Sequence, residues 1–366
     1  MSEPNDIYGM LQRHLDECLP VGFPAAQSGL DLKILKRLFT PEDAELALNL
    51  GPLPETLEEI FPRVKETGMS LGEFEVKLDM MAKKSVIMGG KLIAGEKGEK
   101  RYSLSQWAIG MYEFQVDRLS KELAKDANEY MNKAFYKEWF KPGTPAQMRT
   151  VPVGGSIKVE HHVSNYDDVR NLIKNARGPF SVHNCVCKQN MRLLDRPCKL
   201  TEDERTCNTF GRMARIIIEA GLGREVTRNE MLEALEKYEE KGFVLQPENA
   251  QNPQYICACC GCCCNILQMM KKFPNPAELY TSNYFATVDS ELCDGCETCF
   301  DRCQMEALTI ENGISTVNLN RCIGCGLCVS TCPTNAIQLQ KKEKEIAPPR
   351  DADELYQTIM AKKMAG

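Results

Sequence analysis

Two near-copies of one cysteine pattern restrict the fold of this chain more than any other feature. Each copy has three cysteines spaced three residues apart and a fourth cysteine four residues later. The copies are Cys293, Cys296, Cys299 and Cys303, followed by Cys322, Cys325, Cys328 and Cys332. Thiolates at this spacing are typical ligands of [4Fe–4S] clusters. The repeat therefore predicts a small, duplicated iron–sulfur unit.

The stretch 283–340 resembles the bacterial-type two-cluster ferredoxin family in these eight cysteines and in Pro333. The resemblance implies that each cluster takes its fourth ligand from the other copy. Cluster 1 would use Cys293, Cys296, Cys299 and Cys332, and cluster 2 would use Cys303, Cys322, Cys325 and Cys328. It also implies short strands at 307–310 and 336–339. Gln304 departs from the family, which has proline there. The alternative, a pair of zinc sites, would favour separated C-x-x-C pairs.

The whole chain has 366 residues, which is too long for a ferredoxin alone and predicts two or three domains. Its formal net charge is −6, and each oxidised cluster would add about −2, which disfavours general binding to nucleic acid or anionic membranes. We expect no membrane span and no signal peptide, because no long apolar run occurs. Nineteen cysteines without a signal indicate a reducing cytoplasm and metal ligation, and several clusters suggest an anaerobic host.

The N-terminal region, residues 28–105, resembles a winged helix-turn-helix. Predicted helices at 29–39, 40–50, 54–65 and 70–84 precede two strands at 85–88 and 101–104 that flank a Gly- and Lys-rich tip. Thr40 and Ser70 are the expected caps of two of these helices. Acidic and basic residues are nearly balanced here, whereas a DNA reader presents a basic face. We therefore expect a module for protein docking or homodimerisation, with DNA binding as the alternative.

The next segments are predicted as a long connecting helix, a cysteine-rich domain and a tail. An apolar stripe predicts one helix within 106–147 that runs from Trp107 to Phe140. The middle domain, 148–282, is expected to be mixed α/β, with strands at 150–160 and 180–182 and helices at 167–176 and 227–241. The tail, 341–366, should end in a helix over 351–364. The predicted fold class is thus α+β.

Ten further cysteines lie in the middle domain. They are Cys185, Cys187, Cys198, Cys207, Cys257, Cys259, Cys260, Cys262, Cys263 and Cys264. Packing does not explain this density, because exposed thiols oxidise and small thiols bury little apolar area. We expect at least one further [4Fe–4S] cluster with ligands from both ends of this series. A zinc site is the alternative, although the spacing is unlike that of structural zinc sites.

These features together predict an intracellular electron-transfer protein that serves a redox partner or a larger oxidoreductase complex. The chain has no GxGxxG motif and no P-loop, which argues against a dinucleotide- or ATP-driven step. Two alternatives remain open. One is a redox-sensing transcription regulator that reads DNA through the winged helix. The other is an oxidoreductase with chemistry at the second cysteine group.

Overall fold

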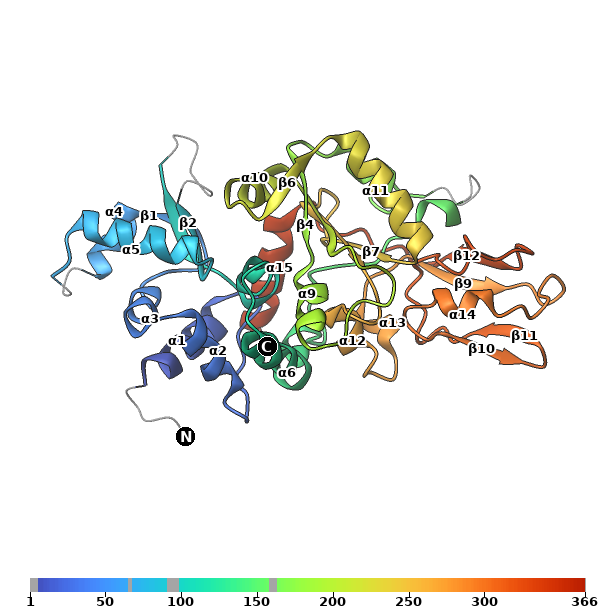
Figure 1. Ribbon diagram of the computed structural model, residues 1–366, viewed down its shortest axis with the longest axis horizontal. Helices are drawn as coiled ribbons and strands as arrows, with labels where there is room; N and C mark the ends of the chain where they lie inside the picture. Colours follow the sequence, from blue (N-terminus) through green and yellow to red (C-terminus); the bar gives the residue numbers. More distant parts are fainter. Residues whose placement is uncertain (1–5, 65–67, 91–98, 158–162, 366) are drawn as a thin grey trace. The chain divides into compact units, whose positions relative to one another are not determined.

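A computed structural model describes residues 6–64, 68–90, 99–157 and 163–365 (Figure 1). The chain forms two compact units. Unit 1 contains residues 1–141, 193–195 and 359–366, and unit 2 contains residues 142–192 and 196–358. None of the helices in the described ranges combines the length and the apolar character needed to cross a bilayer.

Unit 1 begins with short helices whose ends are set by capping residues. Thr40 accepts a hydrogen bond from the Asp43 amide at 3.1 Å, and Ser70 and Glu73 form a reciprocal capping box. Both predicted caps are confirmed. The elements are α1 Ile7–Cys18, α2 Leu30–Leu38, α3 Pro41–Ala47, β1 Glu55–Thr56, α4 Leu57–Ile60, η1 Phe61–Arg63, α5 Leu71–Lys83, β2 Ile87–Gly90, β3 Arg101–Leu104, η4 Trp107–Met111, η5 Glu113–Gln115, α6 Lys121–Tyr130, η6 Met131–Phe135 and α7 Tyr136–Trp139.

Unit 1 also contains a three-stranded antiparallel sheet in the order β1-β3-β2. The predicted hairpin is confirmed, with Ile87 opposite Leu104, while most of its predicted tip, 91–98, lies outside the described residues. The helix predicted at 54–65 is shorter than expected. Glu55 and Thr56 pair with β3 instead, and Thr56 then caps α4.

The single helix predicted within 106–147 is wrong. Ala108 and Ile109 have extended backbone angles, and Asp117 lies in the left-handed region at φ 66°. A regular helix begins only at α6, where Ser120 accepts a hydrogen bond from the Leu123 amide at 3.1 Å. The apolar stripe before α6 is buried in turns: the rings of Trp107 and Tyr112, for example, stack at 5.2 Å. The helical spacing of the apolar residues before α6 therefore reflects their burial and not one continuous helix.

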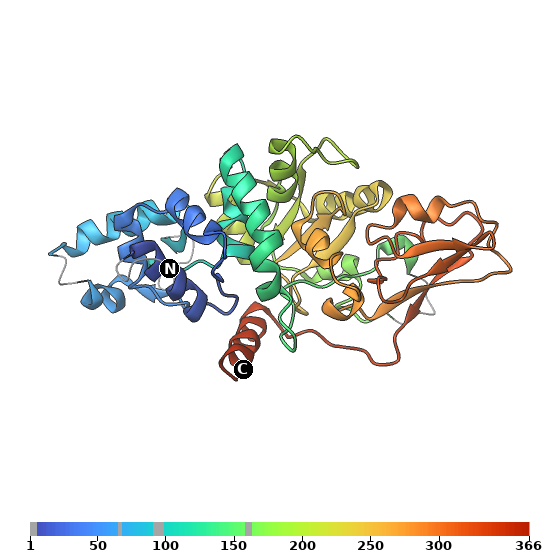
Figure 2. The same ribbon diagram turned by 90° about the horizontal axis from the view of Figure 1, so that it is seen from below.

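Unit 2 is built around a five-stranded antiparallel sheet in the order β6-β4-β5-β8-β7. Figure 1 shows β4, β6 and β7 of this sheet, and Figure 2 shows the same unit from below. The elements after residue 142 are η7 Gly154–Ser156, α8 Val169–Asn175, β4 Phe180–Asn184, α9 Val186–Leu193, β5 Arg205–Phe210, α10 Gly211–Glu219, β6 Gly223–Val226, α11 Arg228–Lys241, β7 Val244–Pro247, β8 Tyr255–Cys259, α12 Asn265–Met270, α13 Pro276–Leu279, β9 Tyr284–Val288, α14 Thr298–Arg302, β10 Leu308–Glu311, β11 Ile314–Val317, β12 Ile337–Lys341 and α15 Ala352–Ala365. Leu193 at the end of α9 and the part of α15 from Ile359 on are assigned to unit 1.

The predictions for the middle of the chain hold except at 150–160. The expected helices correspond to α8 and α11, and the expected strand at 180–182 lies within β4. The segment 150–157 is no strand; Val151 forms one isolated bridge with Leu245, and η7 follows. His161 and His162, which adjoin this segment, lie outside the described residues.

The ferredoxin-like segment forms two antiparallel ribbons within unit 2, drawn in orange and red in Figure 1. The strands predicted at 307–310 and 336–339 correspond to β10 and β12. Strand β10 pairs with β11, and β12 pairs with β9. The Val153 amide donates to the Cys325 carbonyl at 3.0 Å, so segments 148–282 and 283–340 are joined inside one compact unit.

A buried ion pair also ties these two segments together. Arg149 and Asp167 are 1% and 2% exposed, and their Nη1 and Oδ1 atoms lie 2.8 Å apart. Asn283, just before β9, donates to the second Asp167 oxygen at 2.8 Å. Such a pair is costly to break, because removal of one partner leaves the other charge buried.

Replacement of this arginine should strongly destabilise unit 2. We expect Arg149→Met to lower the free energy of unfolding by about 3–5 kcal/mol. The matched control is Arg170→Met, because Arg170 forms an exposed pair with Glu236 at 3.3 Å and should contribute less than about 1 kcal/mol. Anaerobic urea unfolding would measure both, and equal losses would contradict the role given to the buried pair.

Candidate metal centres

The loops that carry the repeated cysteines depend on glycine. Gly295, Gly324 and Gly326 all have left-handed φ angles, between 66° and 76°. A Cβ atom at Gly324 would overlap the Tyr284 carbonyl oxygen, and one at Gly326 would overlap the Ser156 hydroxyl. The loops can therefore follow their tight path only without a side chain at these positions.

Backbone amides donate to several of the repeated thiols. Ala307 donates to Cys303 Sγ at 3.2 Å, Ala286 donates to Cys322 Sγ at 3.4 Å, and Ser315 donates to Cys293 Sγ at 3.5 Å. Amide-to-sulfur hydrogen bonds stabilise the negative charge of an iron–sulfur cluster and tune its potential. The chemistry of these loops thus fits such a cluster.

Four of the eight cysteines line one small cavity with a volume of about 20 Å³. They are Cys303, Cys322, Cys325 and Cys328, which is the set that the ferredoxin resemblance implies for cluster 2. Burial raises the pKa of Cys325 to about 12. The Cys325 thiol would therefore stay protonated until a metal replaces the proton.

The other four cysteines differ widely in exposure. Cys296 is exposed, whereas Cys299 is 7% exposed. Cys332 packs against the small apolar core that contains Cys299, as do Cys303, Cys322 and Cys328. Burial acts to raise the pKa of Cys332, but the Ile337 amide and the Thr334 hydroxyl lower it below its usual value.

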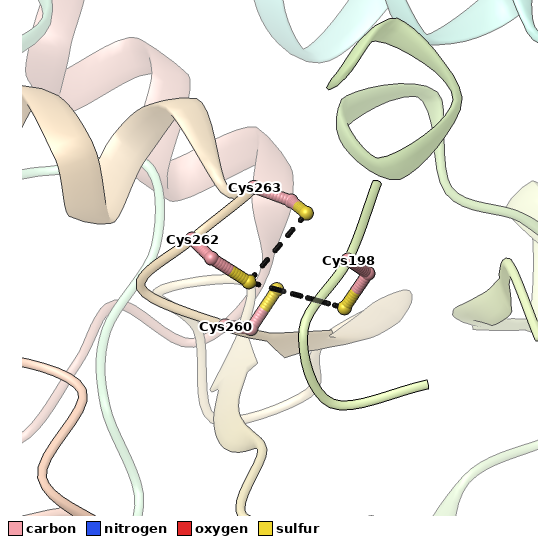
Figure 3. A group of neighbouring side chains, drawn as sticks. All are labelled: Cys198, Cys260, Cys262 and Cys263. Atoms are coloured by element: carbon pink, nitrogen blue, oxygen red, sulfur yellow. Dashed lines mark hydrogen bonds between the residues drawn. The ribbon is translucent and has the colours of Figure 1, made fainter. Parts of the chain in front are cut away.

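The ten cysteines of the middle segment separate into two groups. In the first, which we call the four-thiol site, Cys198 faces a turn that carries Cys260, Cys262 and Cys263 (Figure 3). All four sulfurs lie within 4.8 Å of one another. The sulfur of Cys198 is 3.6 Å from that of Cys260 and 3.9 Å from that of Cys262, and Cys262 and Cys263 are 3.7 Å apart.

These distances fit one tetrahedral metal ion. Metal–sulfur bonds of about 2.3 Å place four tetrahedral sulfurs about 3.8 Å apart. In a [4Fe–4S] cube each thiolate binds a different iron, so its ligand sulfurs do not touch. The four-thiol site therefore could hold a metal, and its spacing favours the zinc-type alternative over the predicted third cube.

The remaining six cysteines form the second group, which we call the six-thiol ring. The Cys185 thiol is hydrogen-bonded with those of Cys187 and Cys207, and the Cys264 thiol with those of Cys187 and Cys259. Cys257 closes the ring through Cys207 and Cys259. The sequence did not indicate this division, because adjacent cysteines such as Cys259 and Cys260 belong to different groups.

Lys188 lies buried beside both groups. It is 2% exposed, donates to Thr206 Oγ1 at 2.6 Å and to the Ala258 carbonyl at 3.2 Å, and lies 4.2 Å from the Phe243 ring centroid. Burial acts to lower its pKa, but the thiols of Cys185 and Cys260 raise it above the usual value. Lys188 therefore remains a buried cation next to groups that bind metals as anions. It was one of several basic residues near Cys187 in the sequence, and only its contacts reveal this role.

Comparison with known proteins identifies part of the repeat. Residues 315–338 match the 4Fe-4S binding domain family, Fer4. The matched segment contains Cys322, Cys325, Cys328 and Cys332. No curated protein and no solved structure matches the chain. The match establishes an iron–sulfur binding motif in this segment.

Substitution of Gly324 should reduce cluster loading. We expect Gly324→Ala to lower iron and acid-labile sulfide per chain, because the new methyl group would displace β9 at Tyr284. Gly313→Ala is the matched control: Gly313 has a similar φ of 79° but has open space around a Cβ, so it should lose only about 1–2 kcal/mol to strain and keep its iron. Equal iron loss in both variants would contradict the steric argument.

Removal of one thiol from the four-thiol site should release one metal ion without sulfide. We expect Cys262→Ser to contain one zinc or iron ion fewer per chain than Cys18→Ser, whose cysteine lies in α1 outside both groups. Elemental analysis and sulfide determination would measure this. A loss of about four irons together with sulfide would instead indicate a cube at this site.

Proposed function

We propose that this chain is an electron-transfer protein whose segment 283–340 carries two [4Fe–4S] clusters. The observation that carries the proposal is the family match at 315–338, supported by amide donors to Cys293, Cys303 and Cys322. Bound clusters would supply one-electron redox chemistry. The role of the chain is to hold the thiolates, exclude water and place donors at the sulfurs.

The ligand sets follow the crossed pattern. Cysteines 303, 322, 325 and 328 line one cavity and would hold cluster 2. Cysteines 293, 296, 299 and 332 would hold cluster 1, and Cys332 packs against the apolar core that contains Cys299. Cys296 is exposed, whereas the four cysteines of the cluster 2 set are all partly buried, so the two clusters would differ in potential.

The surface around Cys296 is suited to electron exchange with a protein partner. Cys296 is exposed, and so are five acidic residues near it in sequence. They are Asp289, Glu291, Asp294, Glu297 and Asp301. An acidic surface beside an accessible cluster steers a partner with a basic face toward it. The partner in this proposal is a redox protein or a larger oxidoreductase complex of a reducing cytoplasm.

Unit 1 fits docking or dimerisation better than DNA reading. If it is a winged helix, α5 would be the recognition helix. Its Lys77 is 2.5 Å from a Glu42 oxygen, and Lys84 is 2.8 Å from Asp43. The wing residue Lys100 contacts Glu75 and Asp79 on the same helix. Cations that are already paired with carboxylates contribute little to phosphate binding.

A carrier role is also favoured over catalysis at the four-thiol site. Structural metal sites have four protein ligands, whereas catalytic sites keep a position open for water or substrate. The four-thiol site offers four sulfurs at mutual contact, which would fill a tetrahedral ion. It therefore fits a structural role beside the clusters.

Loss of one cluster 2 ligand should change the redox properties selectively. We expect Cys325→Ser to lose or convert one cluster, while the second reducible cluster remains and unit 1 keeps its fold. Iron and sulfide analysis and low-temperature EPR of the reduced protein would show this, with Cys18→Ser as control. A wild-type protein without acid-labile sulfide, or one whose clusters cannot be reduced and reoxidised, would contradict the proposed function.

A further inference from the structure

The six-thiol ring has the composition of a second metal site that is separate from the four-thiol site. Its thiols are Cys185, Cys187, Cys264, Cys259, Cys257 and Cys207, in the order in which neighbours are hydrogen-bonded. They are supplied by α9, β5, β8 and the N-terminal end of α12. The six thiols thus form one ring, although their cysteines span much of the middle segment.

The sheet register brings part of the ring together. Cys207 on β5 is directly opposite Cys257 on β8, so their side chains lie on the same face of the sheet. Cys259 is two residues further along β8 and shares that face. Backbone pairing thus fixes the positions of three of the six ring cysteines.

The spacing within the ring differs from that of the four-thiol site. Among the described residues, the four-thiol site is the set whose metal-binding atoms all lie within 4.8 Å of one another. Neighbouring ring thiols touch, but no three of them meet that condition. One tetrahedral ion requires four sulfurs in mutual contact, and the ring lacks that arrangement.

Two buried polar groups beside the ring lack partners. The Tyr280 hydroxyl makes no hydrogen bond within the described part of the chain and is electrostatically coupled to Cys257, Cys259 and Cys264. Gln246 is fully buried; its Nε2 donates to Cys264 Sγ at 3.8 Å, while its Oε1 has no partner. Buried polar groups without partners are unusual and frequently mark a site that binds an ion or ligand.

We propose that the six-thiol ring is a polynuclear soft-metal site that holds at least two metal ions. Thiolate-only donors suit iron–sulfur clusters, copper(I) and zinc. Six thiolates exceed the four that one tetrahedral ion accepts. Their open arrangement leaves room for two or more metal ions at separate positions. Lys188, next to Cys185 and Cys259, offsets part of the negative charge. This site does not depend on the proposed electron-transfer role.

The test compares paired cysteine variants of the full chain, purified anaerobically. The ring variant is Cys207→Ser/Cys257→Ser, the four-thiol variant is Cys198→Ser/Cys262→Ser, and the control is Cys18→Ser. We expect the ring variant to lose at least two metal ions relative to the control, and the four-thiol variant to lose one. Iron, zinc, copper and acid-labile sulfide are measured per chain. Retained far-UV circular dichroism and ferredoxin EPR signals would show that the ring variant still folds.

Whether the ring variant loses sulfide together with metal identifies the kind of metal centre. Loss of sulfide with iron would show an iron–sulfur cluster in the ring, and loss of metal alone would show thiolate-bridged ions; both support the site. A ring variant with the metal content of the control would overturn the proposal. So would loss of the same single ion from both variants, because it would show one mononuclear site with spare cysteines.

A measurement on the unaltered protein covers the case in which the ring variant does not fold. Two ferredoxin clusters and one ion at the four-thiol site account for about nine metal ions. The proposal expects at least about eleven in the fully loaded wild-type chain, with metal–metal scattering in X-ray absorption at any metal other than iron. A fully loaded chain with about nine ions would overturn it.

Discussion

The pairing of β5 with β8 is the interaction on which the arrangement of unit 2 depends. It places Cys207 opposite Cys257, and Lys188 ties the same two strands by its bonds to Thr206 and Ala258. A shift of one residue would turn every side chain of β8 to the opposite face. Cys257 and Cys259 would then leave the ring, and Cys260 would no longer follow the strand into the turn opposite Cys198. The sheet register thus determines how the ten cysteines divide into two groups.

Charge is the second condition that this arrangement must satisfy. Thiolates bind metals as anions, and a closely packed set of them in a protein interior is stable only with compensating cations. The described structure supplies Lys188 between the two groups and amide donors at the ferredoxin thiols. Burial without a metal favours the protonated thiols, as at Cys325. Metal binding and completion of this core are therefore expected to be coupled.

The sequence predicted those features that local chemistry determines. Capping at Thr40 and Ser70 places helix starts correctly, and the repeated cysteine spacing predicted an iron–sulfur segment that the family match supports. The same reasoning failed between Trp107 and Ser120, where an apolar stripe at helical spacing is buried by turns. It also could not divide the second cysteine group. Which thiols meet depends on which strands pair, and that pairing is a long-range property with no signal in residue spacing.

Gln304 shows how the two copies of the repeat have become different. Its Oε1 accepts the Gly261 amide at 2.7 Å, between Cys260 and Cys262 of the four-thiol site, whereas the corresponding position of the second copy is Pro333. Gln304 also directly follows Cys303. The first copy is thus hydrogen-bonded through Gln304 to the turn of the four-thiol site. Pro333 in the second copy has no side-chain acceptor for such a bond. The two copies are consequently not interchangeable. If the sequence of the second copy replaced the first, proline would stand at position 304 and the Gly261 amide would lose this acceptor.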